Sequence, residues 1–237
     1  EPYAMLRKRV IDPLGESKPD WWIWTELAKR MGLGEYFTWK SDEEVFDYLL
    51  EPSGIKDKLE NEVGIYFAEK GYYQYKERPF PTPSKKIEIY SDTLKEHGYD
   101  PLPGYMEPAQ SPVSTPELHK EYPITLISGA RQVEYAHSQQ RNIPALRAQN
   151  PEPLAEMHPA TAQRYGLVDG EMVRISTKVG SVTMRLKATP DMMTGVVSVP
   201  HGWGMANVNE ITNVDTRERI TAYPDFKAIL VRVEPAS

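Results

Sequence analysis

Proline is concentrated between residues 79 and 123, where nine of the chain's 21 prolines lie. Each proline fixes its own φ and lacks a backbone N–H, so this stretch cannot form a long helix or a central strand. We expect it to run extended over a surface, with only a short strand at 87–90 and a short helix from Ser91 to Gly98. So long a stretch with little regular structure is unusual inside a compact domain. It is therefore interpreted as a connector, laid over a body of which much lies outside this chain.

Before the connector the hydrophobic pattern is helical. Apolar residues recur at the spacing of one helix face in Trp24, Leu27, Ala28 and Met31. The helix should begin near Pro19–Asp20 and end at Gly32. A second helix should begin at Ser41, with Glu44 completing a capping box and Val45 and Leu49 facing inward, and stop before Pro52. The tryptophans of the first helix could form an aromatic ligand platform, but a helix packed against a larger core is the favoured interpretation.

After the connector the pattern is that of short strands. Apolar segments at 124–127, 172–175, 182–186, 196–199 and 229–233 are separated by turn residues, and one short helix is expected over 158–166. His158 should cap that helix. Short strands with many turns are typical of a small β-barrel. The sequence thus predicts an α+β chain, with a helical and extended segment over residues 1–120 followed by a β-barrel over 121–237.

The composition excludes several classes of function. The chain has no cysteine, which rules out disulfides, thiolate-bound iron–sulfur clusters and a cysteine nucleophile within it. A net charge of −6 argues against general nucleic-acid binding. We find no stretch of the roughly 20 apolar residues that spans a bilayer and no signal-peptide pattern, so no direct membrane span is expected. Both the cytoplasm and the periplasm stay open as compartments.

One polar segment, SGARQVEYAHSQQRN at residues 128–142, gathers positive charge in this acidic chain. A small-residue turn after a strand exposes backbone N–H groups that can hold a phosphate oxygen, and an arginine can add a bidentate contact. Across 128–147 three arginines accompany a single acid, Glu134. The segment predicts an anion site, although a solvated loop with scattered charges is the alternative. The candidate contacts are Gly129, Arg131, His137, Ser138, Arg141 and Asn142.

A second polar segment, HGWGMANVNEITN at residues 201–213, carries Asn207 and Asn209 two positions apart. If this piece is extended, both amides point to the same side and can meet the edge of a planar heterocycle such as a pterin or purine. The alternative is a turn in which the amides bond the local backbone. His201 is interpreted as a packed histidine rather than a base or a metal ligand. Lys227, just before the last strand, could reach across a barrel mouth but could equally be solvated.

Taken in order, these motifs resemble the C-terminal portion of the large catalytic subunit of molybdopterin or tungstopterin oxidoreductases of the dimethyl-sulfoxide-reductase type. PDWWIWTELAKRMG is similar to a helix late in such subunits. FPTPSKKIEIYSDTLKEHGYDPLPGY is similar to their connector, with Lys85 where glycine is usual. The resemblance continues through SGAR…HSQQRN, EMHPATAQRYGLVDGEMVRIST, PHGWG…NVNEIT and DFKA. Four barrel motifs in this order form a far more specific pattern than any one alone.

The resemblance implies a double-psi β-barrel that binds one half of a bis(molybdopterin guanine dinucleotide) cofactor. The first motif would hold the pyrophosphate and pterin-side groups, the asparagines would meet the pterin edge, and the lysine would complete the pocket. The residues implied are Gly129, Ala130, Arg131, His137, Ser138, Arg141, Trp203, Asn207, Asn209, Phe226 and Lys227. His201 would give structural support beside the pterin.

The resemblance implies no catalytic residue and no metal ligand in this chain. Molybdenum or tungsten would be held by groups outside it, and an iron–sulfur cluster is expected only in the missing N-terminal part. The partners implied are the remainder of the catalytic subunit or a second chain, and an iron–sulfur electron-transfer subunit. The branch containing thiosulfate or polysulfide reductases and formate dehydrogenases is favoured. An acetylene-hydratase-like enzyme, a pterin-binding module without turnover, and a barrel that has lost cofactor binding are the alternatives.

Overall fold

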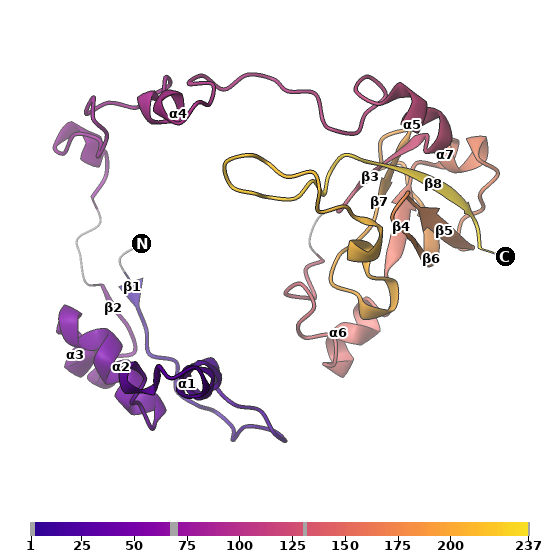
Figure 1. The fold of residues 1–237 in the computed structure, drawn as a ribbon. Coiled ribbons are helices and arrows are strands. Elements are labelled where there is room, and N and C mark those ends of the chain that lie inside the picture. The colour runs from indigo at the N-terminus through magenta and orange to yellow at the C-terminus, as the bar shows by residue number, and fades with distance from the viewer. Residues whose placement is uncertain (1–2, 67–70, 130–131, 237) are drawn as a thin grey trace. The chain divides into compact units, whose positions relative to one another are not determined.

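The computed structural model describes residues 3–66, 71–129 and 132–236 (Figure 1). The chain divides into two compact units, Glu1–Leu102 and Pro103–Ser237. The sequence places the domain boundary near residue 120, shortly before the first barrel strand. That boundary stays a prediction about where the barrel domain begins.

The first unit is mainly helical. Its elements are β1 (Tyr3–Ala4), α1 (Asp20–Arg30), α2 (Asp42–Leu50), α3 (Lys56–Asn61), β2 (Ile65–Tyr66) and α4 (Asp92–Glu96), with three short 3-10 helices at Gly34–Tyr36, Glu51–Ser53 and Gln74–Lys76. Both long helices confirm the sequence prediction. Ser41 caps α2 by accepting a hydrogen bond from the backbone N–H of Glu44 at 3.3 Å, and the Glu44 carboxylate accepts from the backbone N–H of Lys40.

Three of the four residues in the apolar face predicted for α1 are exposed within the described chain. Trp24 and Met31 are 62% and 66% exposed, whereas the buried residues of the helix are Thr25 and Ala28. Helix α2 behaves similarly, because Leu49 is exposed. The apolar periodicity thus predicts the two helices correctly. The described residues of this unit do not form a core large enough to bury the apolar face of α1 and that of α2.

The strand predicted at 87–90 is wrong. Residues 87–90 have no strand conformation, and Ile87 and Ile89 are 72% and 75% exposed. A strand needs a neighbour to pair its backbone groups, and no described strand lies beside this segment. The short helix that follows is confirmed as α4: the Ser91 hydroxyl accepts from the backbone N–H of Leu94 at 3.2 Å, and Gly98 takes a positive φ of 78° after the helix end.

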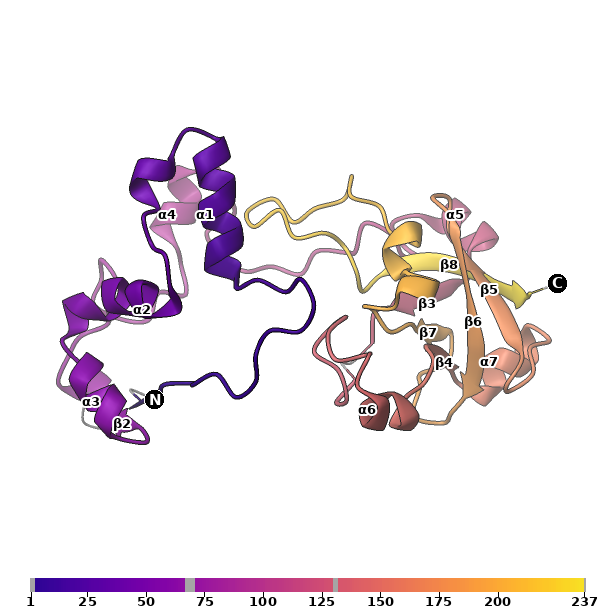
Figure 2. The ribbon, with the colours of Figure 1, turned by 90° about the horizontal axis from the view of Figure 1, so that it is seen from below.

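The second unit contains a closed barrel of six strands in the order β3-β7-β4-β6-β5-β8 (Figures 1 and 2). Its elements are α5 (Pro116–Glu121), β3 (Ile124–Ile127), α6 (Pro144–Gln149), β4 (Leu154–Met157), α7 (Pro159–Arg164), β5 (Met172–Ser176), β6 (Ser181–Ala188), β7 (Val196–Ser198), two 3-10 helices at Gly204–Ala206 and Val208–Ile211, and β8 (Ile229–Pro235). The pairs β3–β7 and β4–β6 are parallel and the other four are antiparallel. The barrel confirms the α+β class and the double-psi β-barrel that the resemblance implies.

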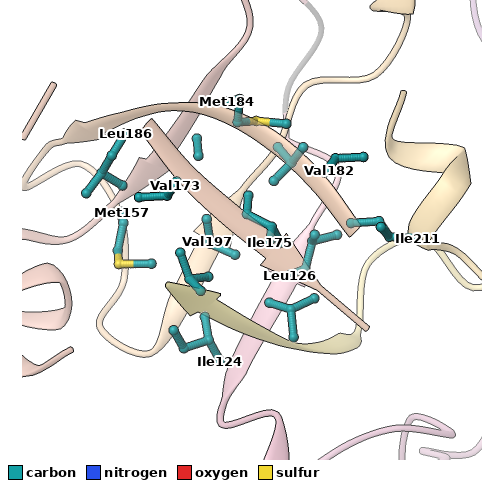
Figure 3. Close-up of a cluster of buried hydrophobic side chains, with 14 of the residues drawn as sticks. Ile124, Leu126, Met157, Val173, Ile175, Val182, Met184, Leu186, Val197 and Ile211 are labelled. Atoms are coloured by element: carbon teal, nitrogen blue, oxygen red, sulfur yellow. The ribbon is translucent and has the colours of Figure 1, made fainter. Parts of the chain in front are cut away.

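The barrel core follows from the alternation of apolar residues along each strand. In β5 the buried positions are Val173 and Ile175, with exposed residues between them. Figure 3 shows these side chains converging with Leu126 and Val197 in the barrel interior. Because side chains alternate between the two faces of a strand, each strand sends every second residue into the core.

Strand β4 and helix α7 differ in how well the sequence predicts them. Strand β4 was not predicted, because LAEM is short and contains a glutamate. Helix α7 was predicted, and its cap is confirmed: His158 accepts a hydrogen bond from the backbone N–H of Ala160 at 3.1 Å through Nδ1. Among the residues that the structure describes, none of the helices has the length and apolar character that crossing a bilayer requires.

Candidate functional site

Strand pairing brings three segments to one end of the barrel. Strands β3 and β7 are parallel, with Ile127 opposite Ser198, so the segments that follow them leave at the same end. Strand β8 is antiparallel to β3, with Ile229 opposite Leu126, so the segment before it arrives at that end. We call this the site end. The three segments are the β3 loop (residues 128–143), the β7 loop (199–213) and the β8 loop (214–228).

Gly129 begins the β3 loop in a conformation that suits glycine. Its φ is +67°, and a Cβ atom there would lie 2.5 Å from the hydroxyl oxygen of Ser198. Ser198 is buried at the end of β7. The glycine is therefore required by its close approach to Ser198, and the predicted approach of its backbone to an anion stays a prediction. Ala130 and Arg131, which were also predicted to contact the cofactor, lie outside the described residues.

Arg141 crosses from the β3 loop to the β7 loop. Its Nε donates to the carbonyl oxygen of Gly202 at 2.7 Å. Its Nη2 donates to the carbonyl oxygens of His137 at 3.0 Å and His201 at 3.3 Å. Burial holds the pKa of Arg141 below its ordinary value, and a nearby tyrosine opposes that shift. Arg141, which the sequence predicts as a contact for an anion, thus donates hydrogen bonds to backbone carbonyls of both loops.

An aromatic pair supports the guanidinium. Trp203 and Tyr135 are both 6% exposed and meet edge to face, with ring centres 5.6 Å apart. The indole N–H of Trp203 donates to Gln132 at 3.1 Å, and the Tyr135 hydroxyl donates to the backbone carbonyl of Asn150. The Trp203 ring is largely enclosed by protein and packs against Tyr135 and Arg141, and its contact with a cofactor stays a prediction.

A histidine pair closes the two loops. His137 Nδ1 lies 2.9 Å from His201 Nε2, with the rings tilted by 54°. His137 has a positive φ of 58°. Beside it Gly202 has a φ of +83°, and a Cβ there would lie 2.8 Å from the carbonyl carbon and oxygen of His137. The backbones of the two loops therefore touch directly, and the packed role predicted for His201 agrees with this contact.

The extended conformation considered for the asparagine segment is wrong. Residues Val208–Ile211 form a 3-10 helix that begins just after Asn207. The Asn207 side chain caps that helix by accepting from the backbone N–H of Asn209 at 3.2 Å. The two amides therefore do not align at a period of two. Asn209 is exposed at the site end, so its side chain remains able to meet a ligand.

The β8 loop brings the last predicted residues to the site end. Phe226 is half-buried and packs edge to face against Tyr223 at 5.8 Å, and Lys227 is exposed two residues before β8. Burial raises the pKa of the neighbouring Asp225, although the backbone N–H of Lys227 donates to its carboxylate and opposes the shift. Ser138 and Asn142 of the β3 loop are exposed as well. The site end thus carries a set of accessible donors around the joined loops.

The sequence interpretation missed Gln132, Tyr135 and Ser198. The first two lie inside the quoted motif at 128–142, where an aromatic residue between polar ones was the available signal. Ser198 is part of an apolar strand, and nothing in its sequence context singles it out.

Within 3–66, 71–129 and 132–236, no group of three or more His, Asp or Glu side chains could hold a metal ion.

A model of the family described as "Molydopterin dinucleotide binding domain" matches residues 124–230, which run from the start of β3 into β8. These residues belong to that family. The matched range contains all three site-end loops of this molybdopterin dinucleotide-binding domain.

Relatives of the chain are dimethyl-sulfoxide-reductase-family molybdopterin enzymes. Acetylene hydratase of Syntrophotalea acetylenica is 37% identical over 85% of this chain and 28% of its own length. The assimilatory nitrate reductase catalytic subunit of Bacillus subtilis is 30% identical over 99% of this chain and 33% of its own length. Dimethyl sulfoxide reductase DmsA of Escherichia coli is 32% identical over 84% of this chain and 27% of its own length.

A solved structure agrees with these matches. Acetylene hydratase from Pelobacter acetylenicus superposes with a TM-score of 0.84 and 31% identity, covering 99% of this chain and 35% of that chain. The chain therefore spans about a third or less of the length of these relatives. The molybdopterin dinucleotide-binding domain accounts for its barrel, and the similarity extends through the helical unit as well.

Proposed function

We propose that this chain is part of the catalytic subunit of a molybdenum or tungsten enzyme and that its barrel holds one dinucleotide of a bis(molybdopterin guanine dinucleotide) cofactor. The observation that carries the proposal is the meeting of the β3, β7 and β8 loops at one end of a molybdopterin dinucleotide-binding barrel. Loop segments that follow β3 and that lie between β7 and β8 supply the donors there, as a large, flat and anionic ligand requires.

The donor set fits such a cofactor. Gly129 takes a positive φ where the β3 loop begins, and a turn of this kind can present backbone N–H groups to a phosphate oxygen. The exposed imidazole of His137 and hydroxyl of Ser138 can donate to pyrophosphate oxygens, and Lys227 adds a positive charge. Asn209 offers both a donor and an acceptor to the pterin edge. Phe226 gives the site an apolar wall beside these groups.

The residues of this chain bind and orient, and the reacting centre lies elsewhere. When bound, the cofactor supplies two-electron or atom-transfer chemistry at its metal. The loops fix the position of the dinucleotide because they are tied to each other and to the ends of three barrel strands. An arrangement held by the scaffold in this way keeps the cofactor in one geometry throughout turnover.

Two reaction classes are compatible with these residues. The thiosulfate reductase PhsA of Salmonella typhimurium is 27% identical over 86% of this chain, which supports the redox branch that the sequence favours. The acetylene hydratase of S. acetylenica is more similar, at 37%, and supports a hydratase that adds water across a triple bond without net electron transfer. We rank the hydratase as the second candidate. An iron–sulfur electron-transfer partner is proposed for the redox branch alone.

The test is metal and nucleotide analysis of the full-length protein in which this sequence occurs. The proposal expects molybdenum or tungsten together with guanosine monophosphate released by acid hydrolysis, in the proportion that a bis-dinucleotide requires. Metal-free and nucleotide-free protein from cells that make the cofactor would overturn it. Turnover of acetylene to acetaldehyde with neither electron donor nor acceptor would select the hydratase, and donor-dependent reduction of a sulfur compound would select the redox branch.

A further inference from the structure

Arg141 joins more separate groups at the site end than the charge pattern of its motif indicates. Its guanidinium donates to one backbone carbonyl of its own β3 loop and to two consecutive carbonyls of the β7 loop. It also lies 4.2 Å from the ring centre of Tyr135 and 3.7 Å from that of Trp203. One aromatic ring comes from each loop. A single side chain therefore contacts both loops through hydrogen bonds and through cation–π contacts.

The same contacts close the guanidinium off from a ligand. Its Nε and Nη2 are engaged by carbonyl oxygens. Its third nitrogen, Nη1, is buried and has no hydrogen-bond partner among the described residues. An anion could therefore reach Nη1 only if the atoms that cover it moved aside. Lysine could not replace this group, because a single ammonium cannot donate to the same three carbonyls and also contact both rings.

We propose that Arg141 is a positioning residue, which holds the β3 loop against the β7 loop and does not itself contact the dinucleotide. The two loops carry His137 and Ser138 on one side and Asn209 on the other. Their relative placement therefore depends on a guanidinium that donates to the backbone of both loops. This inference rests on the proposed function only for what the loops bind, since the tie between them is a property of the barrel alone.

The test uses peptide-resolved hydrogen–deuterium exchange on the full-length protein. The variants are Arg141→Gln, which removes the charge, and Arg141→Lys, which keeps it. The matched control is Arg164→Gln: Arg164 also lies over a tyrosine ring, at 5.7 Å from Tyr165, but belongs to α7 at the opposite end of the barrel. We expect both Arg141 variants to exchange roughly tenfold faster or more in the β3 and β7 loops, as loss of charge-assisted hydrogen bonds predicts. Strands β5 and β6 should stay protected, and the control should match the wild type.

The cofactor content of the same preparations distinguishes a positioning role of Arg141 from direct contact with the dinucleotide. If Arg141 positions the loops, lysine should rescue neither loop protection nor nucleotide content. Restored nucleotide content in Arg141→Lys, with wild-type loop exchange, would make Arg141 a direct anion ligand and overturn the inference. If the wild-type protein never contains the nucleotide but the Arg141 variants still show faster loop exchange, Arg141 holds the β3 and β7 loops together. The same result would refute the proposed function. Should Arg141→Gln fail to fold, the lysine variant alone decides between these outcomes.

Discussion

His137 Nδ1 lies 2.9 Å from His201 Nε2, across 64 positions of sequence. A neutral imidazole has one donor and one acceptor nitrogen, so one ring donates to the other. This contact joins the β3 and β7 loops at the same two residues whose carbonyl oxygens accept from Arg141. It shows that the two motifs singled out in the sequence form one structural unit.

A double-mutant cycle tests this pair. His137→Ala and His201→Ala should each lower the free energy of unfolding by about 0.5–1.5 kcal/mol, and the double variant should cost less than the sum. Denaturant unfolding of the three variants measures the coupling. His158→Ala is the control, because His158 caps α7 away from the pair and its cost should add to that of His137→Ala. Additive costs for the His137 and His201 changes would mean that the contact contributes nothing.

The glycine beside this pair should be sensitive to any side chain. Gly202→Ala introduces a Cβ that would lie 2.8 Å from backbone atoms of His137, in addition to the strain of a positive φ. Gly195→Ala has a similar φ of +77° but no atom within 4 Å of the new Cβ. The second change should cost about 1–2 kcal/mol from backbone strain alone, and the first should cost more. Equal costs in denaturant unfolding would argue against a tight approach of the two loops.

Asp225 predicts a pH dependence of stability. Burial raises the pKa of its carboxyl group, so the folded state binds the proton more tightly than the unfolded chain does. Its contribution favours folding in acid and is lost as the pH rises from the unfolded value of about 3.9 through the raised folded value. Asp225→Asn should therefore melt at a higher temperature than the wild type near pH 7, and the difference should vanish near pH 3. A variant that is equally destabilised at both pH values would contradict this expectation.

Lys227 should contribute to cofactor retention if the proposed function holds. Lys227→Gln removes an exposed positive charge at the site end, and loss of a charge-assisted contact should weaken nucleotide retention about tenfold or more. Lys120→Gln is the control, because Lys120 is an exposed lysine of α5. Helix α6 directly follows the β3 loop, and Figure 1 shows α5 at the opposite end of the barrel from α6. Guanosine monophosphate content after dialysis measures the effect. Equal retention in the two variants would remove Lys227 from the site.

The second unit should fold without the first. Residues 103–237 contain a closed barrel that pairs the backbone of all six strands and buries nineteen core residues. Residues 1–102 leave large apolar side chains such as Trp24 and Met31 exposed. Thermal unfolding of the separate pieces should therefore be cooperative for 103–237 and weak for 1–102. A cooperative transition of similar sharpness in both pieces would show that the first unit has its own sufficient core.

Local residue patterns were enough to predict many of the elements. The alternation in Met172–Ser176, the caps at Ser41 and His158, and the apolar run at Ile124–Ile127 each depend on neighbours in sequence, and the structure confirms them. The strand at 87–90 failed for the opposite reason, because an alternating pattern becomes a strand only when another strand pairs with it.

The sequence by itself determined the class of the chain, the position of five of its six barrel strands and the two motifs that meet at the site end. The tertiary structure alone decided what the side chains in those motifs do. Arg141 ties two loops together because strand pairing placed two carbonyl oxygens and the Trp203 ring of the β7 loop beside it. The carbonyl oxygens of His201 and Gly202 lie 60 and 61 positions from Arg141, so they leave no local signal, and only the pairing of β3 with β7 brings them within hydrogen-bonding distance.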